Sequence, residues 1–317
     1  MSRGVLITKE ETLLLKGIAI LMVVIEHFGQ IVGLGFLNPL GPIGVFLFLF
    51  LSGYGLTRSY QKSGRDRYFI KKLQKVYVPY IFTVCIFTLW VLIIGKKTDL
   101  PLFIMELLLI KLPQGSYWYL VLMFYWYICF YFLTFIISNK RYLVTMMMFF
   151  SILIILIMNF NRGYIWQFFS FPLGVIAAFN VENYDKEVSS LQSNNIVSAL
   201  FVVALISIII KKLPYVDSHQ LGFVDTIVQL SLTLSLGILI ILFRDILSRG
   251  VLYKINIFFG GLSYELYLGH AVSLDWVKEA TSINKILIWV LLTVGITWLL
   301  KFLTTYFNKA LYKHIVN

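Results

Sequence analysis

The stretch LLLKGIAILMVVIEHFGQIVGL, residues 13–34, decides the fold class of this chain. It is mostly apolar and reaches the ~20 residues that a helix needs to cross a membrane. Lys16 and His27 lie inside it, and the helical repeat places them on one stripe, roughly 16 Å apart along the axis. Ionisable side chains are costly in a membrane and indicate a function there. We expect Lys16 at the headgroup level and His27 near the middle of the membrane.

The composition excludes a soluble protein. Hydrophobic residues make up 59% of the chain and charged residues only 13%, whereas soluble domains have about 25% charged residues. The net charge of +12 does not indicate a nucleic-acid partner, because no soluble basic domain is present to bind it. Cys85 and Cys129 lie in apolar runs and are interpreted as small buried residues, not as a disulfide framework.

We predict an all-α polytopic membrane protein with about ten transmembrane helices. They form a single transmembrane domain over residues 1–317, without a soluble domain. Segment 100–112 is too short to span and is expected to lie at the interface or to dip back into the membrane. The expected spans are 13–34, 41–60, 77–95, 117–137, 142–159, 164–180, 195–212, 223–243, 255–275 and 284–306.

The positions of Lys and Arg predict the orientation, because these residues are enriched in cytoplasmic loops. With the N-terminus inside, 19 of the 27 fall on the cytoplasmic side. Both termini are therefore placed in the cytoplasm, and the chain is expected in the bacterial cytoplasmic membrane as a multi-pass protein.

His27 has two interpretations that the sequence leaves open: a general base, or a member of a polar network between helices. A desolvated imidazole stays neutral near pH 7, which is the form that a base needs. The adjacent Glu26 points about 100° away, so it either faces another helix or orients the imidazole through a slight bend. Lys16 is either part of the same site or an ordinary anchor at the headgroups. No spacing of His residues typical of a metal site is present, so we expect no metal.

The segment RSYQKSGRDRYFIKKLQKVYVPY, residues 58–80, concentrates basic side chains. This cluster is either a topology signal alone or a binding site for a multiply phosphorylated cytosolic molecule. The second interpretation gives five candidate cofactor-binding residues: Arg58, Arg67, Lys71, Lys72 and Lys75.

Three more segments place polar or small side chains in predicted spans. Gly44, Ser52, Gly53 and Gly55 are expected to let the second helix lie against the first, since small residues allow close approach. Glu265 is costly in a span unless it is protonated, paired or facing a wet cavity. The aromatic pair at the start of the fourth span is typical of a membrane-interface belt. The candidate substrate or cavity residues are Ser52, Trp118, Tyr119, Tyr264, Glu265, Tyr267 and His270.

These motifs, in this order, resemble the acyltransferase family 3 integral membrane proteins. The resemblance rests on a basic residue with a His eleven positions later, an FxxxSG motif, a basic run, a WxL-type start and an SYxLYLxH motif. The matching residues are Lys16 and His27, then Phe48, Ser52 and Gly53, then Lys71, Lys72, Lys75 and Pro79, then Trp118, Tyr119 and Leu120, then Ser263, Tyr264, Leu266, Tyr267, Leu268 and His270. The chain has Lys at positions where Arg is commoner, and Lys lacks the bidentate geometry of Arg.

The resemblance implies an enzyme that moves an acyl group, usually acetyl, from cytosolic acyl-CoA to a hydroxyl of an extracytoplasmic or lipid-linked glycan, peptidoglycan or small molecule. It implies that His27 is catalytic and that cytoplasmic basic residues handle acyl-CoA. An imidazole can act either as a general base on the acceptor hydroxyl or as a carrier of the acyl group. An exporter of a glycan or small molecule and a non-catalytic membrane scaffold stay open. The expected partners are the bilayer, acyl-CoA and a hydroxyl acceptor, and a homo-oligomer is left open.

Overall fold

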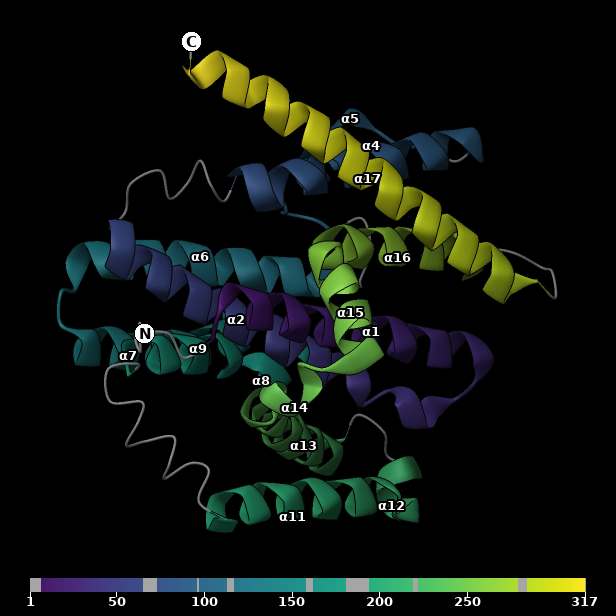
Figure 1. Ribbon diagram of the computed structural model, residues 1–317. Helices are drawn as coiled ribbons and strands as arrows, with labels where there is room; N and C mark the ends of the chain where they lie inside the picture. Colours follow the sequence, from purple (N-terminus) through teal and green to yellow (C-terminus); the bar gives the residue numbers. More distant parts are fainter. Residues whose placement is uncertain are drawn as a thin grey trace. The chain divides into compact units, whose positions relative to one another are not determined.

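The computed structural model describes residues 7–64, 73–95, 97–112, 117–157, 162–180, 194–218, 222–278 and 284–316. All secondary structure in these ranges is helical (Figure 1), so the predicted all-α class is confirmed for them. The chain divides into two compact units, each made of two stretches. Unit 1 comprises Met1–Gly64 and Leu122–Gly261, and unit 2 comprises Arg65–Val121 and Leu262–Asn317.

Most helices belong to one unit, and only α6 crosses the boundary among the described elements. Unit 1 holds α1 (Lys9–Val32), η1 (Gly35–Leu37), α2 (Leu40–Ser63), most of α6 (Trp118–Ile136), α7 (Lys140–Ile157), α8 (Arg162–Gln167), α9 (Ser170–Phe179), α11 (Asn194–Lys211), α12 (Pro214–Ser218), α13 (Phe223–Leu242), α14 (Arg244–Leu247) and α15 (Gly250–Gly261). Unit 2 holds η2 (Leu73–Tyr77), α4 (Val78–Ile93), α5 (Leu100–Leu107), α16 (Ser263–Lys278) and α17 (Lys285–Val316).

Among the described residues, seven helices are long and apolar enough to cross a membrane. They match seven of the ten predicted spans. Two more predicted spans correspond to shorter apolar helices, Gly163–Phe179 and Asn195–Lys211. The membrane class is thus supported, while the count of about ten and the cytoplasmic placement of both termini stay predictions.

The predicted ninth span, 255–275, is not one helix. Helix α15 ends at Gly261, Leu262 is in a turn, and α16 begins at Ser263. The paired glycines at 260 and 261 weaken a helix at this point, because glycine loses the most backbone freedom on ordering. Glu265 therefore lies in the first turn of α16 and not in the middle of one continuous helix over residues 255–275.

Helix α2 is the buried centre of unit 1. Residues 41–51 are all buried, so neighbouring helices cover this stretch of α2 on all sides. The run GPIGVFLFLFL is apolar all round, which suits a helix in the core of a protein as well as one in contact with lipid. Helices α1 and α9 run antiparallel to α2, and α13 runs parallel to it. Of the glycines expected to face the first helix, Gly44 does so, because its Cα lies against the Ala19 carbonyl of α1.

Gly53 faces α9 instead, so the prediction that it packs on the first helix is wrong. A Cβ added to Gly53 would lie 2.3 Å from the Phe171 carbonyl oxygen. In the same crossing, a Cβ added to Gly174 would lie 2.0 Å from the Phe50 carbonyl oxygen. The backbones of α2 and α9 thus touch through small residues, which is how helices pack tightly in membranes. Gly55 faces no neighbour within 4 Å.

Helices α1 and α15 cross in the same way. A Cβ on Gly17 would lie 1.9 Å from the Asn256 carbonyl oxygen, and one on Gly260 would lie 2.0 Å from the Leu13 carbonyl oxygen. Because Gly17 is next to Lys16, this antiparallel contact fixes the position of the α1 stripe within unit 1.

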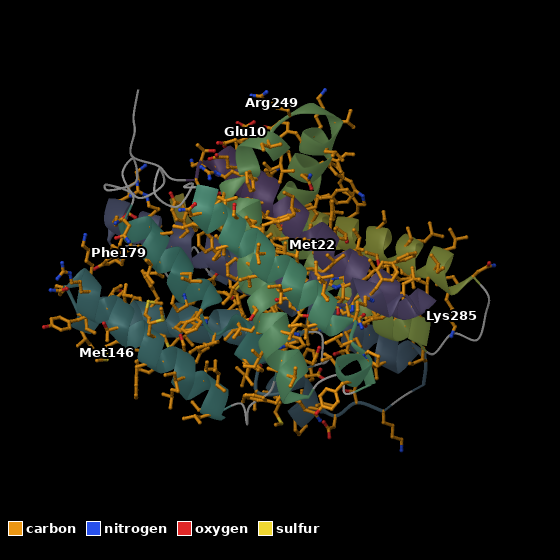
Figure 2. The ribbon with its side chains drawn as sticks, turned by 90° about the horizontal axis from the view of Figure 1, so that it is seen from below. Glu10, Met22, Met146, Phe179, Arg249 and Lys285 are labelled. Atoms are coloured by element: carbon orange, nitrogen blue, oxygen red, sulfur yellow. The ribbon has the colours of Figure 1, made fainter. Side chains whose placement is uncertain are left out.

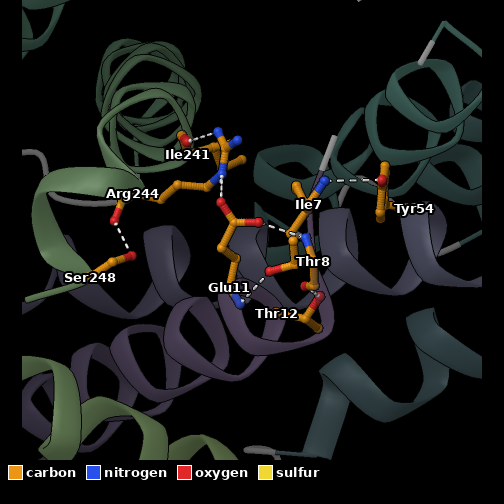
Figure 3. A network of polar contacts seen from close by, with 8 residues as sticks. All are labelled: Ile7, Thr8, Glu11, Thr12, Tyr54, Ile241, Arg244 and Ser248. Carbon is orange, nitrogen blue, oxygen red and sulfur yellow. Dashed lines mark hydrogen bonds and ion pairs between the residues drawn. The ribbon is translucent and has the colours of Figure 1, made fainter. Parts of the chain in front are cut away.

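The start of α1 is held by a polar network (Figure 3). Arg244 is buried, and its Nε donates to Glu11 Oε1 at 2.8 Å while its Nη1 donates to the Ile241 carbonyl at 2.9 Å. Glu11 and Thr8 form a reciprocal capping box, which satisfies backbone donors at the helix start. This network ties α1 to the end of α13 and to α14.

The interior and the outside of unit 1 are both apolar. Met22 of α1, labelled in Figure 2, packs against a core of Ile43, Ala204 and Leu232. Met146 of α7 lies at the edge of the ribbon in the same view and is 41% exposed. Large exposed apolar surfaces of this kind are typical of a face that meets lipid.

In unit 2, α16 and α17 form an antiparallel pair with polar contacts along its length. Ser273 and Thr293 hydroxyls lie 2.6 Å apart, and Gly269 lies against Thr297 one turn along. Lys301 meets Glu265 at the start of α16. Polar contacts between membrane helices of this kind are worth about 0.6 kcal/mol each, and up to ~2.

Helix α5 is too short to span, as predicted for segment 100–112. The Tyr77 and Tyr80 hydroxyls donate to the Leu107 and Glu106 carbonyls in the last turn of α5, at 2.8 and 2.6 Å. Burial raises the pKa of the Glu106 carboxyl, while Lys111 acts in the opposite direction.

Replacing Gly174 by Ala tests the α2–α9 crossing. The added Cβ meets backbone that cannot move aside, so we expect a loss of about 1–3 kcal/mol in stability, measured as a lower midpoint of thermal unfolding in detergent. The matched control is Gly55→Ala in α2, which has open space and should unfold at or above the wild-type midpoint. Equal midpoints for the two variants would contradict the close crossing.

Candidate functional site

The predicted base lies near the C-terminal end of α1, in a small polar cluster. His27 Nδ1 is 3.2 Å from Gln30 Oε1, and Gln30 Nε2 donates to Glu26 Oε1 at 2.8 Å. The second Glu26 oxygen lies 3.6 Å from His27 Nε2. Glu26 therefore does contact the imidazole, through its side chain and through Gln30.

The hydrogen bonds of this cluster determine where the imidazole hydrogen sits. Because the Gln30 amide nitrogen donates to Glu26, the Gln30 carbonyl oxygen is the atom that faces His27. A carbonyl oxygen only accepts, so Nδ1 must carry the hydrogen and donate it. A neutral His27 then has its basic lone pair on Nε2.

The first turn of α2 forms one wall of the cluster. Gly41 lies against the Glu26 carboxylate: a Cβ at this position would be 2.2 Å from Glu26 Oε2. Two glutamines hold the same turn from other helices. Gln167 Nε2 donates to the Pro42 carbonyl at 2.7 Å, and Gln229 Nε2 donates to the Pro39 carbonyl at 3.4 Å.

The other predicted residues of unit 1 are spread along α1 and α2. Lys16 lies in the third turn of α1 and is half-buried. Ser52 accepts a long hydrogen bond of 3.5 Å from the Tyr127 hydroxyl of α6. Arg58 lies near the end of α2 and donates to Gln61 at 2.9 Å.

Unit 2 brings together residues from the predicted fourth and ninth spans. The Tyr119 and Tyr267 rings meet edge to face, with centroids 5.2 Å apart, and the His270 ring lies 5.5 Å from Tyr267. The Tyr117 hydroxyl donates to the Leu268 carbonyl at 3.1 Å. His270 is fully buried, and its Nδ1 lies 3.0 Å from the Leu266 carbonyl oxygen, so Nδ1 carries the hydrogen.

Of the three environments expected for Glu265, the structure has the paired one. Lys301 of α17 lies 3.1 Å from Glu265 Oε1, and the Glu265 side chain is 10% exposed. Tyr264 beside it donates to the Val76 carbonyl at 2.8 Å, which ties α16 to η2.

The remaining predicted residues have fewer contacts in the described ranges. Lys75 is exposed in η2, and Trp118 is half-buried at the start of α6. Arg67, Lys71 and Lys72 lie outside the described residues. His27 belongs to unit 1 and Glu265 to unit 2, and the predicted cavity shared by them stays a prediction.

Sequence reasoning missed three residues of these clusters. Gln30 stands three positions after His27 and four after Glu26, the spacing at which helix side chains meet, so this local signal was readable. Lys301 is a cation inside the last predicted span, and ionisable side chains within a span indicate a specific role. Gly41 has no local signal, because only the packing of α2 on α1 gives it a role.

Within the described part of the chain, no group of three or more His, Cys, Asp and Glu side chains could hold a metal ion.

A family model described as an acyltransferase domain matches residues 14–304, nearly the whole chain. No curated protein and no solved structure matches the chain. The family resemblance read from the motifs is thereby confirmed.

Neutralising the Lys301–Glu265 pair tests whether it holds α16 to α17. Lys301→Met leaves the more buried Glu265 carboxylate without this cation, and a buried charge that loses its partner is destabilising. We expect a lower unfolding midpoint in detergent, and the double variant Lys301→Met/Glu265→Gln should recover at least half of the loss, because no charge is left unpaired.

Lys309→Met, in the exposed end of the same helix, is the matched control and should unfold like the wild type. A double variant less stable than Lys301→Met alone would refute the pairing argument. Normal activity of Glu265→Gln together with a stability loss would assign this residue to structure only.

Proposed function

The chain belongs to the acyltransferase-domain family, acyltransferase family 3, and from this premise we propose that it is a membrane-embedded O-acyltransferase. It moves an acyl group, with acetyl as the usual one, from cytosolic acyl-CoA to a hydroxyl of an extracytoplasmic or lipid-linked glycan or similar acceptor. The observation that carries the proposal is the cluster around His27, in which Gln30 contacts Nδ1 of the imidazole and the Glu26 carboxylate lies near Nε2, inside a candidate span.

In the proposed reaction His27 is the general base. The acceptor hydroxyl gives its proton to Nε2 while its oxygen forms a bond to the thioester carbonyl carbon. The carbon–sulfur bond breaks, and the leaving thiolate takes the proton back from the imidazolium. The products are an ester and the free thiol of CoA, with no net change in protons.

The donor is proposed to bind through basic side chains on the cytoplasmic side. CoA carries several negative charges, and the run from Arg58 to Lys75 is the densest basic stretch of the chain. Lysine supplies point charges here, not the bidentate contacts of arginine. This assignment depends on the predicted orientation.

One observation favours the exporter as the second candidate. The predicted ninth span is broken at Leu262, and transporters use broken helices at their substrate sites. The two functions differ in chemistry, because an exporter moves its cargo without cleaving a thioester.

His27→Ala tests the proposed reaction. The purified protein is mixed with radiolabelled acetyl-CoA and the envelope fraction of cells that lack it, and label transferred to the envelope is counted. We expect transfer to fall at least 100-fold, since general-base catalysis contributes about 10²–10⁴-fold, with the unfolding midpoint near wild type. His219→Ala is the matched control and should keep full activity. Substantial transfer by His27→Ala would remove it from the mechanism, and no transfer by the wild type would favour the exporter.

Neutralising Lys71, Lys72 and Lys75 together tests donor binding. We expect the KM for acetyl-CoA to rise severalfold at low salt, and the difference from wild type to shrink at high salt, where exposed charges are screened. The control removes three other basic residues predicted to be cytoplasmic, namely Lys140, Arg141 and Lys254, and should leave the KM unchanged. An unchanged KM in the first variant would reduce the cluster to a topology signal.

A further inference from the structure

We propose that Gln30 and Glu26 are positioning residues for His27, and that Gly41 leaves the space in which the Glu26 carboxylate lies. The inference rests on the proposed function, because it assigns roles around the same histidine. Gln30 keeps the imidazole hydrogen on Nδ1, which leaves Nε2 as the base. Glu26 stabilises the imidazolium that forms when Nε2 takes the proton of the acceptor hydroxyl.

Gln30 selects the tautomer of His27. A neutral imidazole carries one hydrogen, and the nitrogen without it is the base. Gln30 turns its carbonyl oxygen to Nδ1 because its amide nitrogen is held by Glu26 at 2.8 Å. Without this acceptor, the Glu26 carboxylate beside Nε2 would attract the hydrogen to Nε2, and the base would be lost.

Glu26 acts on the charged form of His27 more than on the neutral form. The 3.6 Å between Glu26 Oε2 and His27 Nε2 is too long for a hydrogen bond but short enough for an ion pair. The carboxylate faces a lone pair while Nε2 is neutral, and the attraction arises only after Nε2 has been protonated. A group that stabilises the charged state selectively lowers the barrier of the reaction.

Gly41 has no side chain, and this allows the Glu26 carboxylate to lie against α2. The Glu26 carboxylate occupies the space that a side chain at position 41 would need. Gln229 and Gln167 hold the carbonyls on either side of Gly41, which keeps this turn from moving aside. The turn is also the N-terminal end of α2, whose partial positive charge favours a carboxylate.

The competing explanation is that Gln30 and Glu26 form an ordinary side-chain pair four positions apart, which adds about 0.2–0.5 kcal/mol to a helix. Such a pair would set neither the tautomer of His27 nor the rate of transfer. The tests below use readouts that this structural role would not change.

The first test reads the tautomer by ¹⁵N NMR of histidine-labelled protein in detergent, at a pH where His27 is neutral, with His27→Ala used to assign its signals. We expect the Nδ1–H form in the wild type and a shift to the Nε2–H form in Gln30→Leu. A wild-type Nε2–H signal, or an unchanged signal in Gln30→Leu, would overturn the inference.

The second test measures kinetics with the labelled acetyl-CoA and envelope assay. Gln30→Leu, Glu26→Gln and Gly41→Ala should each lower kcat about 10- to 100-fold, the size of effect that partners of an active side chain produce. The KM for acetyl-CoA should stay within about twofold of wild type, as for groups that act after binding. Gly55→Ala in the same helix is the control for Gly41→Ala and should keep the wild-type kcat.

The two tests separate this inference from the proposed function. The tautomer is measured without any acyl-CoA, so it does not depend on the reaction. Full activity of His27→Ala would end the proposed chemistry whatever the NMR shows. Inactive His27→Ala together with wild-type kcat in Gln30→Leu, Glu26→Gln or Gly41→Ala would leave the chemistry in place and refute the positioning role of that residue.

Discussion

The close approach of α2 to its neighbours is the constraint on which unit 1 depends. Gly44 meets the backbone of α1, and Gly53 with Gly174 brings the backbones of α2 and α9 together. Helices gain no hydrophobic driving force from each other in lipid, so packing through small residues supplies much of their attraction. Larger side chains at these points would separate the helices and displace every group that α2 carries.

The polar cluster at His27 follows from this packing. Glu26 and Gln30 belong to α1, but the Glu26 carboxylate lies against Gly41 in the first turn of α2. Gln167 of α8 and Gln229 of α13 donate hydrogen bonds to the carbonyls of this turn. Buried polar groups are costly unless they are hydrogen-bonded. Because several helices share this one turn, the imidazole is fixed by packing and by hydrogen bonds together.

In unit 2, polar contacts join the two helices α16 and α17. Helices α16 and α17 are joined by a row of contacts that includes an ion pair, Glu265 with Lys301, and a hydroxyl pair, Ser273 with Thr293. A half-exposed lysine beside a buried carboxylate removes most of the penalty of placing that carboxylate in a membrane protein. Tyr267 and His270 of the same α16 form an aromatic cluster with Tyr119 of α6.

The sequence by itself determined the membrane class and most helices, because composition and apolar length are local properties, and the order of its motifs carried the family resemblance. It also contained the spacing of Gln30, which the i+3 and i+4 rule reveals. Only the tertiary structure decided that Gly53 faces α9, that Lys301 pairs with Glu265 and that the Glu26 carboxylate lies against Gly41. These depend on which helix faces become neighbours, and a uniformly apolar helix such as α2 carries no periodic pattern that identifies its partners.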